Sequence, residues 1–244
     1  MIKEKDQIQR FFRIRRFFNL NEVVVFPQSA DTLHLVDTIF KEENWHLWTD
    51  SSGNGDPPPD FYSNHYKIMM DMMEIYDDEK KKGVNSKIRE RKYERMIIGH
   101  RSSPEDLKLV CNILPDKANN IYHDYKSYIK HFERVVNEHI ESIKLYQKNH
   151  PGFKTLFFLW DESISYFKTN AEGKPVDIHR CFEDKRFVNL FLSNGIDYVF
   201  WFTPYKKSNY DNEYPLMAFY DVEKTDINEC IDYDTSSIIC AEKQ

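Results

Sequence analysis

Residues 56–79 concentrate carboxylate side chains of the kind that hold a divalent metal ion. The stretch carries seven of them, at Asp56, Asp60, Asp71, Glu74, Asp77, Asp78 and Glu79. Mg²⁺ prefers such hard oxygen ligands and is usually bound by one or two carboxylates together with waters and substrate phosphates. A bound metal lowers the pKa of its water and neutralises the charge that develops on a phosphate. We expect three of these side chains to be the metal ligands: Asp60, which follows three prolines, and Asp71 and Glu74 on the next apolar run.

The geometry of such a site depends on whether residues 65–76 form a strand or a helix. The run is apolar, short and preceded by prolines, which favours a strand. In a strand, Asp71 and Glu74 point to opposite faces, so only Glu74 would join Asp60. In a helix, Asp71 and Glu74 share one face. A purely structural interpretation also stands, in which Asp60 begins a turn and the other carboxylates lie on a solvent-exposed edge.

Two short matches resemble the motif of the PD-(D/E)XK nuclease superfamily. They are Pro59-Asp60 for the first half of the motif and Glu74-Ile75-Tyr76 for the second. The order of a helix, strands, carboxylates, a long helix and a strand over residues 31–160 is also similar to the core of that family. The resemblance implies a restriction-endonuclease-like core, Mg²⁺ held by Asp60 and Glu74, and a lysine that activates the attacking water.

In this sequence Tyr76 occupies the lysine position of the second half-motif. A lysine from a neighbouring element takes that role in some members of the superfamily, so the resemblance implies Lys67 or Lys80 as the substitute. We take Lys67 together with Asp60 and Glu74 as the expected catalytic set.

A basic stretch comes directly after the carboxylates. Residues 80–95 hold eight Lys and Arg against two Glu. Beside a metal site, such a stretch can bind the phosphates of DNA or RNA, although charge runs are more often solvated surfaces. The whole chain has a net charge of −6, which supplies no global attraction for nucleic acid. The expected nucleic-acid-binding residues are Lys81, Lys82, Lys87, Arg89, Arg91 and Lys92.

Other polar patterns favour structural roles. Asp161-Glu162 ends an apolar strand in the manner of a Walker B element, but the chain contains no Gly-x-x-x-x-Gly-Lys-Ser/Thr string, which excludes an ordinary P-loop NTPase. We therefore interpret this pair as ending the strand and capping the next segment of the chain. His123, His131 and His139 advance by eight residues along the long helix, so they drift around it and form no ligand cluster.

The surrounding elements predict an α/β fold with a mixed central sheet flanked by helices. Strand-like runs occupy residues 21–26, 65–76, 107–114, 156–163, 196–202 and 216–222, and helical spacing marks residues 31–40, 122–146 and 184–192. The strand–helix–strand order over residues 156–202 indicates a βαβ unit with parallel strands. We expect one domain over residues 1–244, with an N-terminal basic-aromatic helix at 1–20 and an acidic C-terminal segment at 211–244 that frays.

The composition of the chain bears on its cellular location and its partners. Four widely spaced cysteines, an N-terminus unlike a signal peptide and the lack of a long apolar stretch predict a cytoplasmic protein with reduced thiols and no membrane partner. Seven glycines are few for glycine-rich nucleotide-binding loops. High Lys, Asn, Ile, Tyr and Phe usage is typical of an AT-rich bacterium or its phage. DNA, RNA, another protein and a second copy of the chain all remain open as partners.

Two functions fit these observations, and a small-molecule site at the strand ends near Asp161 and Thr203 is a third option. The first is a Mg²⁺-dependent, nuclease-like hydrolase that acts on or binds nucleic acid through an acidic site beside the basic stretch. The alternative is a non-catalytic, protein-binding protein, regulatory or defence-related, whose α/β core is inactive. The sequence leaves open whether the chain is an enzyme.

Overall fold

The computed structural model describes residues 23–51, 59–75, 124–163, 165–203 and 216–240, and these form an α/β fold. The strands are β1 (Val23–Phe26), β2 (Thr49–Asp50), β3 (Phe61–Ser63), β4 (Ile68–Ile75), β5 (Lys154–Asp161), β6 (Tyr166–Thr169), β7 (Pro175–Ile178), β8 (Tyr198–Thr203), β9 (Leu216–Asp221) and β10 (Ile238–Cys240). The α-helices are α2 (Ala30–Phe40), α5 (Tyr125–Asn149) and α6 (Lys185–Leu192).

A seven-stranded mixed sheet forms the centre of the fold, in the order β1-β9-β8-β5-β4-β3-β2. Strands β4, β5 and β8 are parallel to one another, and β9 is antiparallel to β8 and parallel to β1. At the other edge, β3 runs antiparallel to both β4 and β2. The predicted α/β class and mixed sheet are therefore confirmed, and so is the parallel pairing of β5 with β8 around α6.

The central strands form where the sequence is apolar at nearly every position. Every residue of β8 and β9 is buried, and β5 is buried from its second residue onwards, as expected for strands covered on both faces. The helices begin at side-chain caps, since Ser29, Asp124 and Asp184 accept hydrogen bonds from backbone N–H groups in the first turns of α2, α5 and α6.

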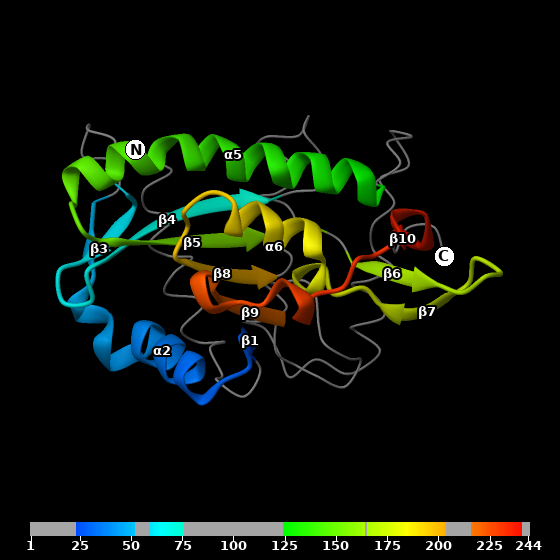
Figure 1. Ribbon diagram of the computed structural model, residues 1–244, viewed down its shortest axis with the longest axis horizontal. Coiled ribbons are helices and arrows are strands. Elements are labelled where there is room, and N and C mark those ends of the chain that lie inside the picture. Colours follow the sequence, from blue (N-terminus) through cyan, green and yellow to red (C-terminus); the bar gives the residue numbers. More distant parts are fainter. Residues whose placement is uncertain (1–22, 52–58, 76–123, 164, 204–215, 241–244) are drawn as a thin grey trace, which may run out of the picture.

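Helices cover both faces of the sheet, with α5 and α6 on one side and α2 on the other (Figure 1). Strand β4 shows the division through its alternation. Met69 and Met73 pack into the core cluster that contains α5 and α6, whereas Met70 and Met72 pack into the cluster that contains α2. A residue's position along β4 therefore decides which helix its side chain meets.

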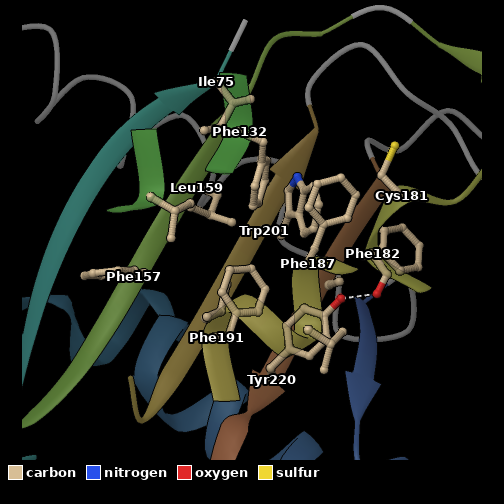
Figure 2. Packing of buried hydrophobic residues seen from close by; sticks show 14 of the residues in the cluster. Ile75, Phe132, Phe157, Leu159, Cys181, Phe182, Phe187, Phe191, Trp201 and Tyr220 are labelled. Atoms are coloured by element: carbon tan, nitrogen blue, oxygen red, sulfur yellow. Dashed lines mark hydrogen bonds between the residues drawn. The ribbon is translucent and has the colours of Figure 1, made fainter. Parts of the chain in front are cut away.

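The core beneath α5 and α6 is built on large rings. Figure 2 shows Trp201 of β8 beside Phe132 of α5 and Phe187 of α6. The Phe132 ring lies 4.4 Å from Phe187 and 4.8 Å from Trp201, centroid to centroid, and all three side chains are fully buried. Such ring contacts add to the free energy of area burial, so α5 is held firmly in one position over the sheet.

The C-terminal part of the acidic segment differs from the prediction that it frays. Residues 222–240 pass through short 3₁₀ helices into β10, which pairs with β6 and thereby completes a second sheet of order β10-β6-β7. Tyr233 is buried in this segment and donates a hydrogen bond to Glu183, 3.3 Å away. Buried apolar residues between the acidic ones, Cys230, Tyr233 and Ile238, hold the segment against the domain.

Several predicted features lie outside the described residues. These are the N-terminal basic-aromatic helix at 1–20, the basic stretch 80–95, and the strand predicted at 107–114. Within the part of the chain that the structure describes, no helix is long and apolar enough to cross a membrane.

Candidate functional site

The structure brings Asp60 and Asp71 together where β3 and β4 meet. The pairing of these strands matches Phe61 with Met70 and Tyr62 with Met69, and one further step places Asp60 opposite Asp71. The two carboxyl groups are close enough to share a hydrogen bond. Asp71 is buried and Asp60 is half-buried, so the pair lies at the boundary between solvent and core.

The backbone of β4 holds the side chain of Asp60. Its Oδ2 accepts a hydrogen bond from the N–H of Met72, 2.8 Å away. Because β3 begins at Phe61, the carboxylate of Asp60 pairs with β4 at the point where the strand itself starts. A fixed backbone donor restricts the rotamers of Asp60, so its carboxylate stays beside Asp71.

Helix α5 supplies two further members of the site. His139 Nδ1 donates to Asp71 Oδ2 at 2.6 Å, and the Tyr146 hydroxyl donates to the same oxygen at 3.2 Å. Residues seven apart on a helix lie on one face about 10 Å from each other, so both side chains converge on a carboxylate that lies between them. Met73 of β4 packs into the same core as α5, which keeps the helix over this part of the strand.

Burial and neighbouring charges shift the pKa values of three groups at this site. Burial, followed by the charge of Asp71, raises the pKa of Asp60 to about 7, against the lowering effect of the Met72 N–H. Burial alone would lower the pKa of His139, but its hydrogen bond to Asp71 and the charge of that carboxylate outweigh burial and raise it. Burial, with the charge of Asp71, also raises the pKa of Tyr146. The site therefore holds a proton on Asp60 up to about neutral pH.

Glu74 belongs to the opposite face of the sheet from Asp71. Asp71 contacts α5, and strand alternation turns Glu74 toward the face that α2 covers. The structure thus places Asp60 with Asp71 and separates Asp71 from Glu74, so the expected metal set of Asp60, Asp71 and Glu74 does not lie on one face. The strand alternative is the one that the structure shows, over Ile68–Ile75, and the carboxylate beside Asp60 is Asp71.

Lys67 lies in the turn before β4, with a φ of 54°. Its Nζ lies 5.1 Å from the centre of the Phe153 ring. Asp71 is four residues further along the strand, or about 13 Å at 3.3 Å per residue. The structure therefore does not bring Lys67 to the Asp60–Asp71 pair. The six expected nucleic-acid-binding residues between Lys81 and Lys92 lie outside the described part of the chain.

The pair Asp161-Glu162 is buried at the end of β5. Asp161 Oδ2 accepts hydrogen bonds from the Tyr128 hydroxyl at 2.8 Å and from Trp201 Nε1 at 3.0 Å. Its Oδ1 accepts from the Ser163 N–H at 2.9 Å, which caps the turn after the strand. Because both oxygens of Asp161 have donors, this carboxylate ties α5 and β8 to β5, in agreement with the structural interpretation of the pair.

The carboxylate oxygens of Asp60 and Asp71 are ligands that suit a small hard cation. Among the described residues, no group of three or more His, Cys, Asp or Glu side chains is arranged to hold a metal ion. Mg²⁺ needs fewer protein ligands, because it keeps several waters and commonly takes only one or two carboxylates. Two adjacent carboxylates, one of them with a pKa raised to about 7 by burial and by its neighbour, are a pair that a divalent cation would stabilise.

The roles of His139 and Tyr146 are absent from the sequence prediction. The signal was present in the helix pattern, since His139 occupies a position in line with Phe132, Val136 and Ile143 on the buried stripe of α5. A polar side chain on an apolar stripe needs a buried partner, and Asp71, a carboxylate on an apolar strand, is that partner.

No protein-family model, curated protein or solved structure matches the chain.

Proposed function

We propose that the protein is a Mg²⁺-dependent, nuclease-like hydrolase in which Asp60 and Asp71 hold the cation. The observation that carries this proposal is the adjacency of the two carboxylates, which the pairing of β3 with β4 brings side by side. When bound, the metal would supply charge neutralisation for a phosphodiester and a water of lowered pKa. The pair revises the ligands expected from the resemblance, with Asp71 in place of Glu74.

The order of elements supports the same proposal. Helix α2, the antiparallel strands β2, β3 and β4, helix α5 and the parallel strand β5 succeed one another as expected for a nuclease-like core. The two helices cover opposite faces of the sheet (Figure 1). In that arrangement the carboxylates lie on the face covered by α5.

The chain's own residues prepare the site in three ways. The Met72 N–H orients Asp60, the donors on α5 orient Asp71, and burial excludes water from one side of the pair. Exclusion of water strengthens every charge interaction there. A cytoplasmic setting goes with this proposal, because the described cysteines, Cys181, Cys230 and Cys240, are buried free thiols.

Cleavage of DNA and RNA tests the proposal. Supercoiled plasmid, single-stranded DNA and single-stranded RNA are each incubated with the full chain and Mg²⁺ or Mn²⁺, with EDTA as the blank. We expect metal-dependent cleavage that Asp60→Asn and Asp71→Asn each reduce by at least a hundredfold. Glu74→Gln is the matched control on the opposite face of β4, and it should leave the rate within about threefold of wild type.

The results separate the two functions that the sequence left open. Loss of cleavage in Glu74→Gln with activity retained in Asp71→Asn would refute the assignment of Asp71. If isothermal titration calorimetry detects no binding of Mn²⁺ and no substrate is cut, the proposal is wrong, and the non-catalytic protein-binding alternative gains support from any stable protein complex.

A further inference from the structure

We propose that His139 and Tyr146 are positioning residues that orient Asp71 for binding the cation. The inference rests on the proposed function and assigns new roles within the same site. Neither residue is offered as a ligand or as a group that touches substrate. Their effect passes entirely through the carboxylate of Asp71.

Both donors act on one oxygen of Asp71. His139 Nδ1 at 2.6 Å and the Tyr146 hydroxyl at 3.2 Å both donate to Oδ2. The donors come from positions two turns apart on α5, so together they oppose rotation of the carboxylate in either direction. Among the described residues, no further hydrogen-bond donor to Asp71 is found on α5, and Oδ1 is the oxygen that the helix leaves for another partner.

A second tyrosine of α5, Tyr128, makes a Tyr–Asp hydrogen bond with a purely structural role, and it serves for comparison. Tyr128 donates to Asp161 Oδ2, and that carboxylate also accepts from Trp201 on Oδ2 and from the Ser163 N–H on Oδ1. Asp161 is fully buried, and both of its oxygens are used. Asp71, in contrast, receives its α5 donors on one oxygen only, and the carboxyl group beside it is that of half-buried Asp60.

Hydrogen bonds to Oδ2 of Asp71 orient this carboxylate without blocking Oδ1 from a cation. Carboxylates that bind metals are themselves hydrogen-bonded by neighbouring side chains, and loss of such a neighbour typically weakens metal binding by about tenfold to a hundredfold. The imidazole of His139 has one tautomer in this role, since the carboxylate accepts and Nδ1 therefore carries the proton. The side chain of His139 is 30% exposed, whereas that of Asp71 is 6% exposed, so the contact lies at the border between solvent and core.

The test measures Mn²⁺ affinity of the full chain by isothermal titration calorimetry. Tyr146→Phe removes one hydroxyl and little volume, and His139→Ala removes the other donor. We expect each to raise the dissociation constant for Mn²⁺ by about tenfold to a hundredfold. His139→Asn can place an amide N–H near the position of Nδ1, so it should recover most of the loss.

Tyr128→Phe is the matched control, because it removes an equivalent Tyr–Asp hydrogen bond from the same helix away from the site. It should lower thermal stability as much as Tyr146→Phe does while leaving Mn²⁺ affinity unchanged. Melting curves identify a variant that fails to fold, and the conservative Tyr146→Phe substitution remains informative if His139→Ala does so.

The outcomes for this inference and for the proposed function are distinct. If wild type binds Mn²⁺ and both Tyr146→Phe and His139→Ala bind it equally well, the positioning roles are wrong while the proposed function stands. If Tyr128→Phe lowers the affinity for Mn²⁺ to the same extent, the loss comes from general destabilisation of α5, and the inference is overturned. If wild type does not bind Mn²⁺, the proposed function fails and this inference fails with it.

Discussion

Asp60 should make the protein less stable as the pH rises toward neutrality. In the folded protein, burial and the charge of Asp71 raise the pKa of Asp60 from 3.8 to about 7. A carboxyl group with a raised folded pKa binds its proton more tightly in the native state than in the unfolded chain. Its contribution to stability is therefore complete below pH 4 and is lost as the pH rises through 7.

The size of the effect can be worked out from the pKa difference. Each pH unit between the unfolded and folded pKa costs about 1.4 kcal/mol, so ionisation of Asp60 should lower the free energy of unfolding by about 4 kcal/mol between pH 4 and pH 8. Asp60→Asn has no ionisable group, and its amide oxygen can still accept the Met72 N–H. The variant should match wild type near pH 4 and exceed it by about 4 kcal/mol at pH 8.

Urea unfolding followed by tryptophan fluorescence measures this difference in buffers with EDTA at half-unit steps from pH 4 to pH 8. Titrating groups far from the site cancel in the comparison of wild type with Asp60→Asn, so the difference reports Asp60 together with its charge coupling to His139. A difference between the two proteins that stays constant over this range would refute the reasoning. So would a variant that is less stable than wild type at pH 8, because that result means that the ionised carboxylate stabilises the fold.

Three further substitutions test contacts away from the Asp60–Asp71 pair. Phe132→Ala should cost about 3–5 kcal/mol of stability in urea unfolding, because it leaves a cavity in the ring core. Tyr128→Phe should cost about 1–3 kcal/mol by the same measurement, since buried Asp161 loses a donor. Lys67→Gly should change stability by no more than about 1 kcal/mol, because glycine adopts the φ of 54° without strain while the contact with Phe153 is lost. The same variant should cleave nucleic acid at the wild-type rate, and a large loss of cleavage would return Lys67 to the catalytic set.

The sequence predicts the elements of this fold well where a segment is long and its apolar residues form a clear run or helical spacing. The apolar runs at β5 and β8 and the helical spacing of α5 are each found within a few residues of the predicted bounds. Short strands are harder, because β2 and β3 contain only two and three residues and carry too little pattern to recognise. Strands β6, β7 and β10 contain only four, four and three residues and escape prediction for the same reason. Strand β10 also pairs with β6, which lies far away in the chain.

The candidate site, like the fold, can be predicted from the sequence only in part. The sequence identifies Asp60 and Asp71 as candidates, and the strand alternation that separates Asp71 from Glu74 is among the alternatives it leaves open. Which carboxylate lies beside Asp60 depends on the register between β3 and β4. That register cannot be predicted from a strand of three residues. The buried stripe of α5 marks His139 as a polar side chain that needs a partner. Only the packing of α5 over β4 shows that the partner is Asp71 and that Tyr146 donates to the same carboxylate.

The pairing of β1 with β9 has a consequence for synthesis of the chain. Val23 pairs with Met217, about 190 residues later, and at the usual 5–20 residues per second a ribosome needs roughly 10–40 s to make the intervening chain. During that time the edge of β1 that pairs with β9 lacks this partner, and the apolar side chains of Val23, Val25 and Phe26 lack the cover that β9 and its neighbours give them. Because this pairing is so distant in sequence, β1 should be among the last strands to join the sheet.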